Sequence, residues 1–271
     1  MSLITITRGI GTGGAAVARQ VAEALDIPLY DDDRLQQEAL RMGIRSGDLK
    51  SMNEKAPGLF DRVLSSRPGI YVEFMEAVVL EAARTGKGVI LGHGSQILLR
   101  DFGCALHVLV LADTATRVER LSSQRGIRRE VAEKLIQKSD SQQRGFFRFA
   151  FHRNLADPSL YDLVVNTEKM GLDLSARLIV EAARSDQVST CGLSALLAME
   201  RLSRVKSIEA ILQKQNLNLN MVHIEVEDNG NARVSGAVPN KEDRRRLIAA
   251  MKEVPKDLHV EVDVVAMPTG A

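Results

Sequence analysis

The sequence of 271 residues predicts an α/β fold, in which helices cover both faces of a parallel sheet, followed by a small α+β module. Two observations predict the α/β part. Residues 88–91 and 105–112 are apolar runs, which are typical of strands buried on both faces of a parallel sheet. Such runs alternate with helical patterns up to about residue 185. A third observation predicts the module: apolar and polar residues alternate from Val222 onward, as in a sheet with one wet face.

The first element, at residues 3–7, is a short apolar strand. A helix is predicted after it because Val17, Val21 and Leu25 recur every four residues. The glycines between the two elements are Gly9, Gly11, Gly13 and Gly14. A strand, a glycine-rich turn and a helix together make an anion site, since the helix offers free N–H groups at its start. The alternative is a tight turn that merely joins the strand to the helix.

The remaining elements of the α/β part follow from the same patterns. Residues 34–66 are helical in pieces, broken by glycines and a proline. The aspartates at 31–33 favour a helix N-cap, with a metal cluster as the alternative. The other expected elements are a short strand within 26–33, a helix over 71–86, strands over 88–91 and 105–112, helices over 114–126 and 128–153, a strand over 161–167 and a helix over 173–185.

The pattern changes after the α/β part, and a polar linker followed by a helix is expected over 187–203. Residues 204–267 then predict the order helix, strand, strand, helix, strand. Within this module, residues 221–238 form a hairpin and residues 258–265 form the last strand. The first domain is therefore expected to cover 1–186.

Composition and charge exclude several classes of protein. A net charge of +1 and an aromatic content of 4% offer no surface for nucleic acid. No stretch approaches the ~18 unbroken apolar residues of a membrane helix, and no secretory signal is evident, so we expect a cytoplasmic protein without a transmembrane segment. Cys104 and Cys191 lie far apart in the sequence and are expected to be thiols in a reducing compartment.

The glycine loop lacks the charged centre of the usual phosphate-binding loop, G-x-x-x-x-G-K-[ST]. In that form the lysine contacts the β- and γ-phosphates, and the hydroxyl holds magnesium. This loop can be aligned with the pattern in two ways, with either Gly13 or Gly14 as its last glycine. In both alignments, small residues within 14–16 occupy the lysine position and the hydroxyl position. Arg8 and Arg19 are the nearest cations, and Arg8 leaves the strand at the loop, where it could reach a phosphate.

The chain resembles the cytidylate-kinase-like family of P-loop proteins in five segments, ITITRGIGTGG, IPLYDDDRL, VILGHGSQILLRDFGCALHVLVLAD, RGIRREVAEKLIQKSDSQQRGFFRF and YDLVVNTEKMG. The branch that it resembles more closely has a loop of roughly the form S-R-x-x-G-S-G-G-R-E, which also lacks the lysine. The resemblance covers residues 1 to about 185 and implies a P-loop kinase-like sheet. It also implies a nucleoside monophosphate kinase, which converts ATP and CMP or dCMP into two diphosphates with Mg²⁺.

The resemblance also implies roles for individual residues. Lid arginines would close over the reaction, where planar guanidinium groups neutralise the charge on the transferred phosphoryl group. The implied catalytic residues are Arg8, Asp140, Arg144 and Arg148. The residues implied to hold ATP are Gly9, Gly11, Thr12, Gly13, Gly14, Arg125 and Arg128. The residues implied to face the acceptor are Asp31, Gly92, His93 and Gly94. No residue is identified as a metal ligand.

This chain departs from the family's pattern in three places. Ala15 replaces an arginine after the glycines, His93 replaces the arginine of a glycine–arginine–glycine turn, and no Ser or Thr stands where magnesium would be held. Losing one charge-stabilising donor typically raises the barrier by ~2.7–4 kcal/mol. We therefore expect turnover to suffer more than nucleotide binding. For Asp140, Arg144 and Arg148, at steps of four, the alternative is an exposed salt-bridged helix face.

Residues 204–267 resemble the BON module, a small αββαβ unit, through VHIEVEDNGNARVSGAVPNKEDRRRLIAAM and LHVEVDVV. Such modules are associated with lipid, ligand or protein recognition, so the resemblance implies a ligand-sensing or partner surface. Three hypotheses follow for the whole chain: a phosphotransferase with a weakened loop, a nucleotide-sensing regulatory protein that signals through this module, or an interaction scaffold that binds no nucleotide. A homo-oligomer is compatible with each of them.

Overall fold

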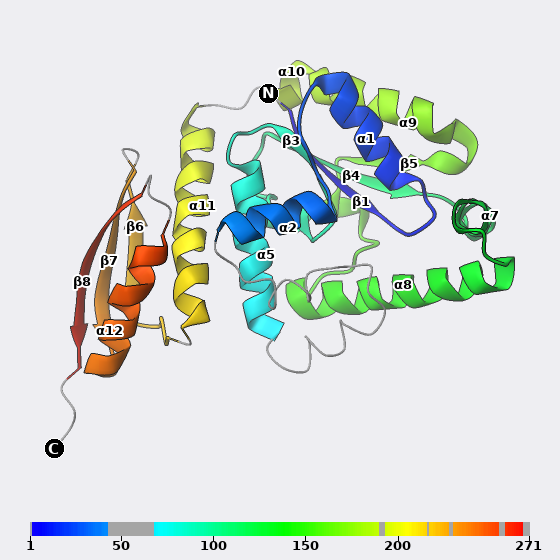
Figure 1. Cartoon of the computed structure of the whole chain (residues 1–271). Coiled ribbons are helices and arrows are strands. Elements are labelled where there is room, and N and C mark those ends of the chain that lie inside the picture. Colours follow the sequence, from blue (N-terminus) through cyan, green and yellow to red (C-terminus); the bar gives the residue numbers. More distant parts are fainter. Residues whose placement is uncertain are drawn as a thin grey trace.

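The computed structural model describes residues 2–42, 68–189, 193–215, 217–227, 230–254 and 258–267. The helical pieces expected over 43–66 lie outside these residues. Within the described residues the chain forms a five-stranded sheet and a separate three-stranded sheet, each with its own helices (Figure 1). The predicted fold class, an α/β part followed by a small α+β part, is confirmed.

The first sheet is parallel throughout, with the strand order β2-β3-β1-β4-β5. Its strands are β1 (Leu3–Arg8), β2 (Leu29–Tyr30), β3 (Gly88–Leu91), β4 (Ala105–Leu111) and β5 (Leu163–Asn166). After β1 the chain builds β2 and β3 on one side of it and then β4 and β5 on the other. Ligands bind beyond the carboxyl ends of strands at such a reversal of strand order. The glycine loop that follows β1 therefore lies at the expected binding edge.

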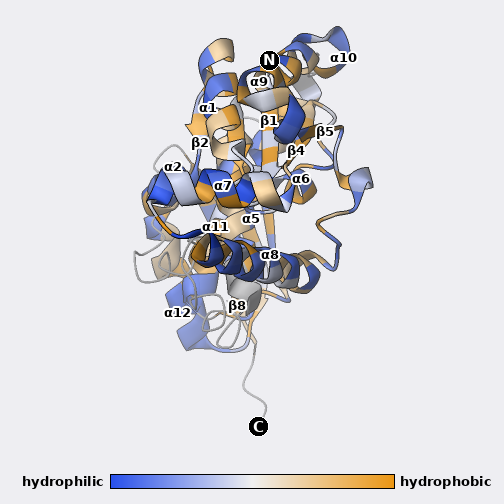
Figure 2. Ribbon diagram, turned by 90° about the vertical axis from the view of Figure 1, so that its right-hand side faces the viewer, coloured by the Kyte–Doolittle hydropathy of each residue, from blue (hydrophilic) through white to orange (hydrophobic). Residues whose placement is uncertain are grey.

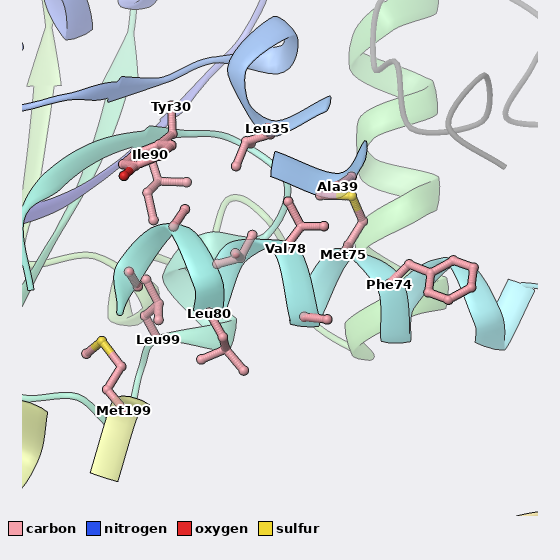
Figure 3. Close-up of a cluster of buried hydrophobic side chains, with 14 of the residues drawn as sticks. Tyr30, Leu35, Ala39, Phe74, Met75, Val78, Leu80, Ile90, Leu99 and Met199 are labelled. Carbon is pink, nitrogen blue, oxygen red and sulfur yellow. The ribbon is translucent and has the colours of Figure 1, made fainter. Parts of the chain in front are cut away.

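Helices cover both faces of this sheet (Figure 1). They are α1 (Gly14–Leu25), α2 (Asp32–Arg41), α5 (Pro68–Ala83), α6 (Ser95–Leu98), α7 (Thr114–Arg125), α8 (Arg129–Phe151), α9 (Thr167–Arg184) and α10 (Asp186–Ser189), with a 3-10 turn η1 (Pro158–Leu160). Helices α1 and α9 pack on one face, where Ile4 and Ile6 lie fully buried. The other face is covered by α2 and α5. Figure 3 shows part of this second core, in which Met75 of α5 lies beside Ala39 of α2 and Ile90 lies beside Tyr30.

Helices α7 and α8, here called the lid helices, are held at both ends. Near their junction, Val118 and Leu121 of α7 pack with Ala132 and Ile136 of α8. Figure 2 shows α8 as a largely hydrophilic ribbon along most of its length. Its C-terminal end is anchored because Phe146 and Phe147 are buried in the core that α5 shares, with Phe151 packed against them; the three ring centroids lie 5.4–6.0 Å apart.

The C-terminal part has the predicted order helix, strand, strand, helix, strand. Its elements are α11 (Leu193–Lys214), β6 (Val222–Val226), β7 (Asn231–Val238), α12 (Lys241–Ala250), a 3-10 turn η2 (Met251–Glu253) and β8 (His259–Ala266). Strands β6 and β7 are antiparallel, whereas β7 and β8 are parallel. One face of the sheet is buried by α11 and α12, with Val234 and Leu247 fully buried. The other face is polar, which accounts for the alternating pattern.

A single helix, α11, runs through the boundary predicted between 187–203 and 204–267. Its early residue Met199 is fully buried in the core of the first part, against α5. Its later residues Ile208 and Ile211 are buried in the core of the C-terminal part. The helix carries apolar residues on more than one side because it packs against both parts.

Cys104, expected to be a thiol, is instead disulfide-bonded, and its partner lies outside the described residues. None of the helices in the described part of the chain is long and apolar enough to span a membrane.

Candidate functional site

The loop between β1 and α1 is a tight turn held by backbone and threonine contacts. Gly11 and Gly13 have positive φ angles of 81° and 80°, and Gly13 is the N-cap of α1. The N-cap Gly13 has no side chain to cap the helix, so amides at the start of α1 can face an anion. The Thr12 hydroxyl donates to the Gly9 carbonyl (2.9 Å) and accepts from the Gly14 N–H (3.3 Å). The Thr12 hydroxyl therefore forms hydrogen bonds within the loop itself.

Close packing around the loop explains its glycines. A Cβ atom at Gly11 would lie 2.6 Å from the Arg117 carbonyl oxygen, and one at Gly14 would lie 2.5 Å from Cβ of Arg8. A side chain at either position requires its neighbours to move. Gly14 is the position that a loop lysine would take in one register on the usual pattern, so the packing itself opposes a lysine there.

Arg117 connects the loop with both lid helices. Its Nε donates to the Ile10 carbonyl (2.8 Å), and Nη1 and Nη2 donate to the two carboxylate oxygens of Asp140 (2.9 and 2.7 Å). A bidentate pair of this kind fixes both side chains. Asp140, implied by the resemblance to be catalytic, thus ties α8 to α7 and to the loop. Arg117 was not predicted from the sequence, although its spacing of three from Arg120 on α7 was an available signal.

Arg120, about one turn after Arg117 on α7, also holds the loop. Its Nη1 donates to the Thr12 carbonyl (3.0 Å) and the Thr167 hydroxyl (2.7 Å), and its Nη2 donates to the Thr167 carbonyl (2.9 Å). The Thr167 hydroxyl itself lies 2.7 Å from the Thr12 carbonyl. The loop is therefore fixed by contacts from α7 and from the start of α9.

A cavity of about 370 Å³ opens between the loop, α7 and α8. We call it the loop cavity. Among the described residues, its cationic side chains are Arg8, Arg125 and Lys138, and no Asp or Glu lines it. Three cations beside uncapped helix amides, without a carboxylate, favour a polyanion.

A second cavity of about 210 Å³ lies beside the loop cavity, at the carboxyl ends of β1 and β4. Asp140 and Arg144 line it, and the two cavities share Arg8, Gly9 and Gln143. The side-chain amide of Gln143 donates to the Arg8 carbonyl (3.1 Å), so this pair separates them. Burial raises the pKa of nearby Tyr161 to about 12, so its hydroxyl stays protonated and donates to the carbonyl of Leu155, another lining residue (2.8 Å).

The aspartates at the start of α2 have different environments. Asp31 is the N-cap of α2, and its side chain accepts from the Arg34 N–H (3.0 Å), as the N-cap interpretation predicted. Asp32 turns inward instead. Its Oδ1 lies 3.0 Å from Nε2 of His93 and 3.7 Å from Nη2 of Arg8. The carboxylate that approaches the loop is therefore Asp32, one residue after the aspartate predicted to face the acceptor.

The turn after β3 has three consecutive residues with positive φ, at Gly92 (83°), His93 (58°) and Gly94 (72°). A histidine in this conformation is strained by about 1–3 kcal/mol and persists where its surroundings fix it. His93 is only 2% exposed and is held by Asp32. A Cβ atom at Gly94 would lie 2.3 Å from the Phe151 ring, so α8 packs directly on this turn.

Comparisons with known proteins agree with this geometry. The model of the cytidylate kinase-like family matches residues 3–169. This chain belongs to the cytidylate kinase-like family. It is similar to the cytidylate kinases of Pyrobaculum islandicum (25% identical over 182 residues, 67% of this chain and 92% of the relative) and Aeropyrum pernix (28% over 177 residues, 64% and 94%).

A solved structure, an uncharacterized protein from Eubacterium ventriosum, shares the fold. It has a TM-score of 0.51 and 21% identity, and the likeness covers 68% of this chain and 99% of that chain. The chain is thus a kinase-like phosphotransferase of the nucleoside monophosphate kinase type. The family match ends at the start of α9, before α11 and the second sheet.

The family implies ATP and Mg²⁺ in general, but the side chains near this loop do not fit a protein-held magnesium ion. Mg²⁺ is held by carboxylate and other oxygen ligands. Asp32 is engaged by Arg8 and His93, and both oxygens of Asp140 are engaged by Arg117. In the described residues, no group of three or more His, Cys, Asp or Glu is arranged to hold a metal.

The structure brings together only part of the predicted site. Gly9, Gly11, Gly13, Gly14 and Arg125 line the loop cavity together with Arg8. Arg128, the N-cap of α8, and Arg148, in its last turn, are exposed and line neither cavity. Lys138, which no motif singled out, lines the loop cavity.

Proposed function

We propose that this chain binds a nucleoside triphosphate in the loop cavity and transfers its terminal phosphoryl group to a nucleoside monophosphate, CMP or dCMP, with low turnover. The single observation that carries the proposal is the loop cavity, which has loop glycines on one side, three cations and no carboxylate. The relatives named cytidylate kinase support CMP or dCMP as the acceptor.

In this proposal the polyphosphate lies against the loop and the start of α1. Arg8 and Arg125 contact it, and the transferred group points toward the second cavity, which Arg144 lines. Guanidinium groups are suited to this role because they present fixed donors to the equatorial oxygens that gain charge. Asp140 positions Arg117 rather than contacting substrate.

Low turnover follows from the missing donors. The loop has no lysine, Ala15 replaces an arginine, and His93 is buried against Asp32 rather than turned to an acceptor phosphate. Each lost donor costs about 2.7–4 kcal/mol of transition-state stabilisation. Binding depends on the loop and the remaining cations, which are present.

Two measurements on the full chain test the proposal. Calorimetric titration with ATP and with CMP should show binding of each. A coupled assay with ATP, Mg²⁺ and CMP or dCMP should show ADP formation that depends on the acceptor and is weak. The proposal fails if no nucleoside triphosphate binds, or if the triphosphate binds and ADP formation is the same with and without acceptor.

A nucleotide-sensing regulatory protein is a second candidate, favoured by α11. This helix packs on α5 and also forms part of the core of the C-terminal sheet. Helix α5 in turn contacts α2 and α8, which flank the site. In this candidate the BON-like unit formed by α11 to β8 recognises a ligand or partner. Nucleotide binding in the loop cavity changes how far the recognition surface of this unit is exposed.

Hydrogen exchange separates the two candidates. For a sensor, ATP binds without turnover and changes exchange protection in β6 to β8, far from the cavity. For the enzyme, protection changes are confined to the loop and the lid helices. An interaction scaffold, the third hypothesis, would bind no nucleotide at all.

A further inference from the structure

Lys138 has a position that the loop motif did not predict. It lies in the middle of α8 and lines the loop cavity, as do Gly11, Gly13 and Gly14. The preceding turns of α8 are fixed by Ala132 and Ile136, which are buried against α7. The lysine therefore stands on a helix that packs against α7, which also lines the loop cavity.

We infer that Lys138 supplies from the lid the ammonium that the loop lacks, and that the loop cavity accepts a nucleoside polyphosphate without a metal ion. This inference rests on the proposed function and names the form of its ligand. The loop cannot carry the lysine itself, because a side chain at Gly14 would collide with Arg8. The ammonium must therefore come from another element, and among the residues that the structure describes Lys138 is the lysine that lines the cavity.

The other two cations of the cavity do not replace Lys138. Arg8 lies 3.7 Å from Asp32 and is part of the pair network with His93. Arg125 stands in the last turn of α7 and is exposed, as Lys138 is, but it presents a planar guanidinium group rather than an ammonium. An ammonium is a compact point charge on a flexible stem, which suits contact with adjacent phosphates.

The charge of the cavity argues for the free polyanion. Mg²⁺ bound to ATP cancels part of the charge that Arg8, Arg125 and Lys138 would otherwise neutralise, and like charges at close range repel. Among the described residues no carboxylate lines the cavity; Asp32 lies outside the lining, 3.7 Å from Arg8, and both oxygens of Asp140 are engaged by Arg117. A metal ion therefore brings extra positive charge without finding a ligand on the protein.

Calorimetry on the full chain tests the inference, with ATP, ADP, AMP and inorganic tripolyphosphate, each in EDTA and in MgCl₂. We expect ATP to bind in EDTA at least as tightly as in MgCl₂, and affinity to fall from ATP to ADP to AMP. Lys138→Ala should weaken ATP and tripolyphosphate about tenfold or more, the loss expected for one contact to a charged group. Lys138→Arg should retain most of the affinity.

Lys134→Ala is the matched control. Lys134 lies one turn earlier on α8, is exposed, and is not among the residues that line the loop cavity. Its removal changes the net charge equally and should leave affinity unchanged. Thermal melting of both variants checks that each is folded.

The outcomes separate the inference from the proposed function. If wild-type protein binds ATP but Lys138→Ala behaves as Lys134→Ala does, the lysine assignment is wrong. If ATP binding disappears in EDTA, the metal-free ligand is wrong. If the wild-type protein binds no nucleotide in either buffer, the proposed function falls together with the inference.

Discussion

At the scale of single residues, the loop is defined by what its neighbours exclude. Gly14 is small because Arg8 packs against it, and Gly11 is small because the backbone of Arg117 does. The cations that serve this loop therefore stand on other elements. A single substitution that restores the lysine of the usual motif at Gly14 would collide with the side chain of Arg8.

Gly14→Lys should not restore turnover. The new Cβ would lie 2.5 Å from Cβ of Arg8, so the loop must shift, and we expect a loss of about 1–3 kcal/mol in the free energy of unfolding. The coupled assay and denaturant unfolding measure both effects. Ala15→Lys is the control, because Ala15 is exposed and the lysine is added without the collision. A large gain in turnover for Gly14→Lys would contradict this account.

His107 should make stability depend on pH. Burial lowers the pKa of its ring, which is partly offset by Asp162, and its Nδ1 lies 2.9 Å from the Thr5 hydroxyl in the core of the sheet. Because the folded state resists protonation, the unfolded state binds more protons below its own pKa of about 6.5. The free energy of unfolding should therefore fall as the pH drops from about 6.5 through the lower pKa of the folded state.

The size of this effect is limited to about 1.4 kcal/mol per pH unit for one proton. Denaturant unfolding at pH 7.5 and pH 5 measures it, with His107→Gln as the comparison. The variant should lose less stability on acidification than the wild type. Equal losses in the two proteins would show that other groups cause the change.

At the scale of elements, α8 acts as a connection between the loop cavity and the core. Its middle presents Lys138 to the cavity, and its end packs Phe151 on the turn after β3. The position of the lid helix is therefore set by an aromatic contact with the turn that also holds His93. A change in this turn should move the lid.

Gly94→Ala tests this connection. Gly94 has a φ of 72°, and its Cβ would lie 2.3 Å from the Phe151 ring, so we expect a loss of about 1–3 kcal/mol in stability and weaker nucleotide binding. Gly145→Ala, in α8 itself, meets nothing within 4 Å and should stabilise the helix by about 0.5–1 kcal/mol. Thermal melting measures the stability of the two variants, and calorimetry measures their nucleotide affinity. Equal changes in Gly94→Ala and Gly145→Ala would argue against a role for the contact between Gly94 and Phe151.

At the scale of the whole molecule, α11 joins the two sheets into one packing unit. It buries Met199 in the first core and Ile208 in the second. A helix shared in this way makes the two parts unfold together, because neither core is complete without it.

Met199→Ala should therefore destabilise both parts. Met199 is fully buried, so we expect a loss of about 2–5 kcal/mol. Exchange protection should fall by similar amounts in β1 and in β7. Met221→Ala, at a residue that is 47% exposed, is the control and should change little. Unchanged protection of β7 in Met199→Ala would show that the parts unfold independently.

The sequence by itself determined the strands, the order of both parts and the glycine loop, because their signals are local: apolar runs, period-two alternation in the second sheet, and glycines between a strand and a helix. Only the tertiary structure decided which charged residues meet this loop. Arg117 and Lys138 reach it because two helices fold back over it, and Asp32 rather than Asp31 turns inward because the cap fixes the direction of the helix start. Contacts between segments more than a hundred residues apart leave no periodicity in the sequence, so spacing could not reveal them.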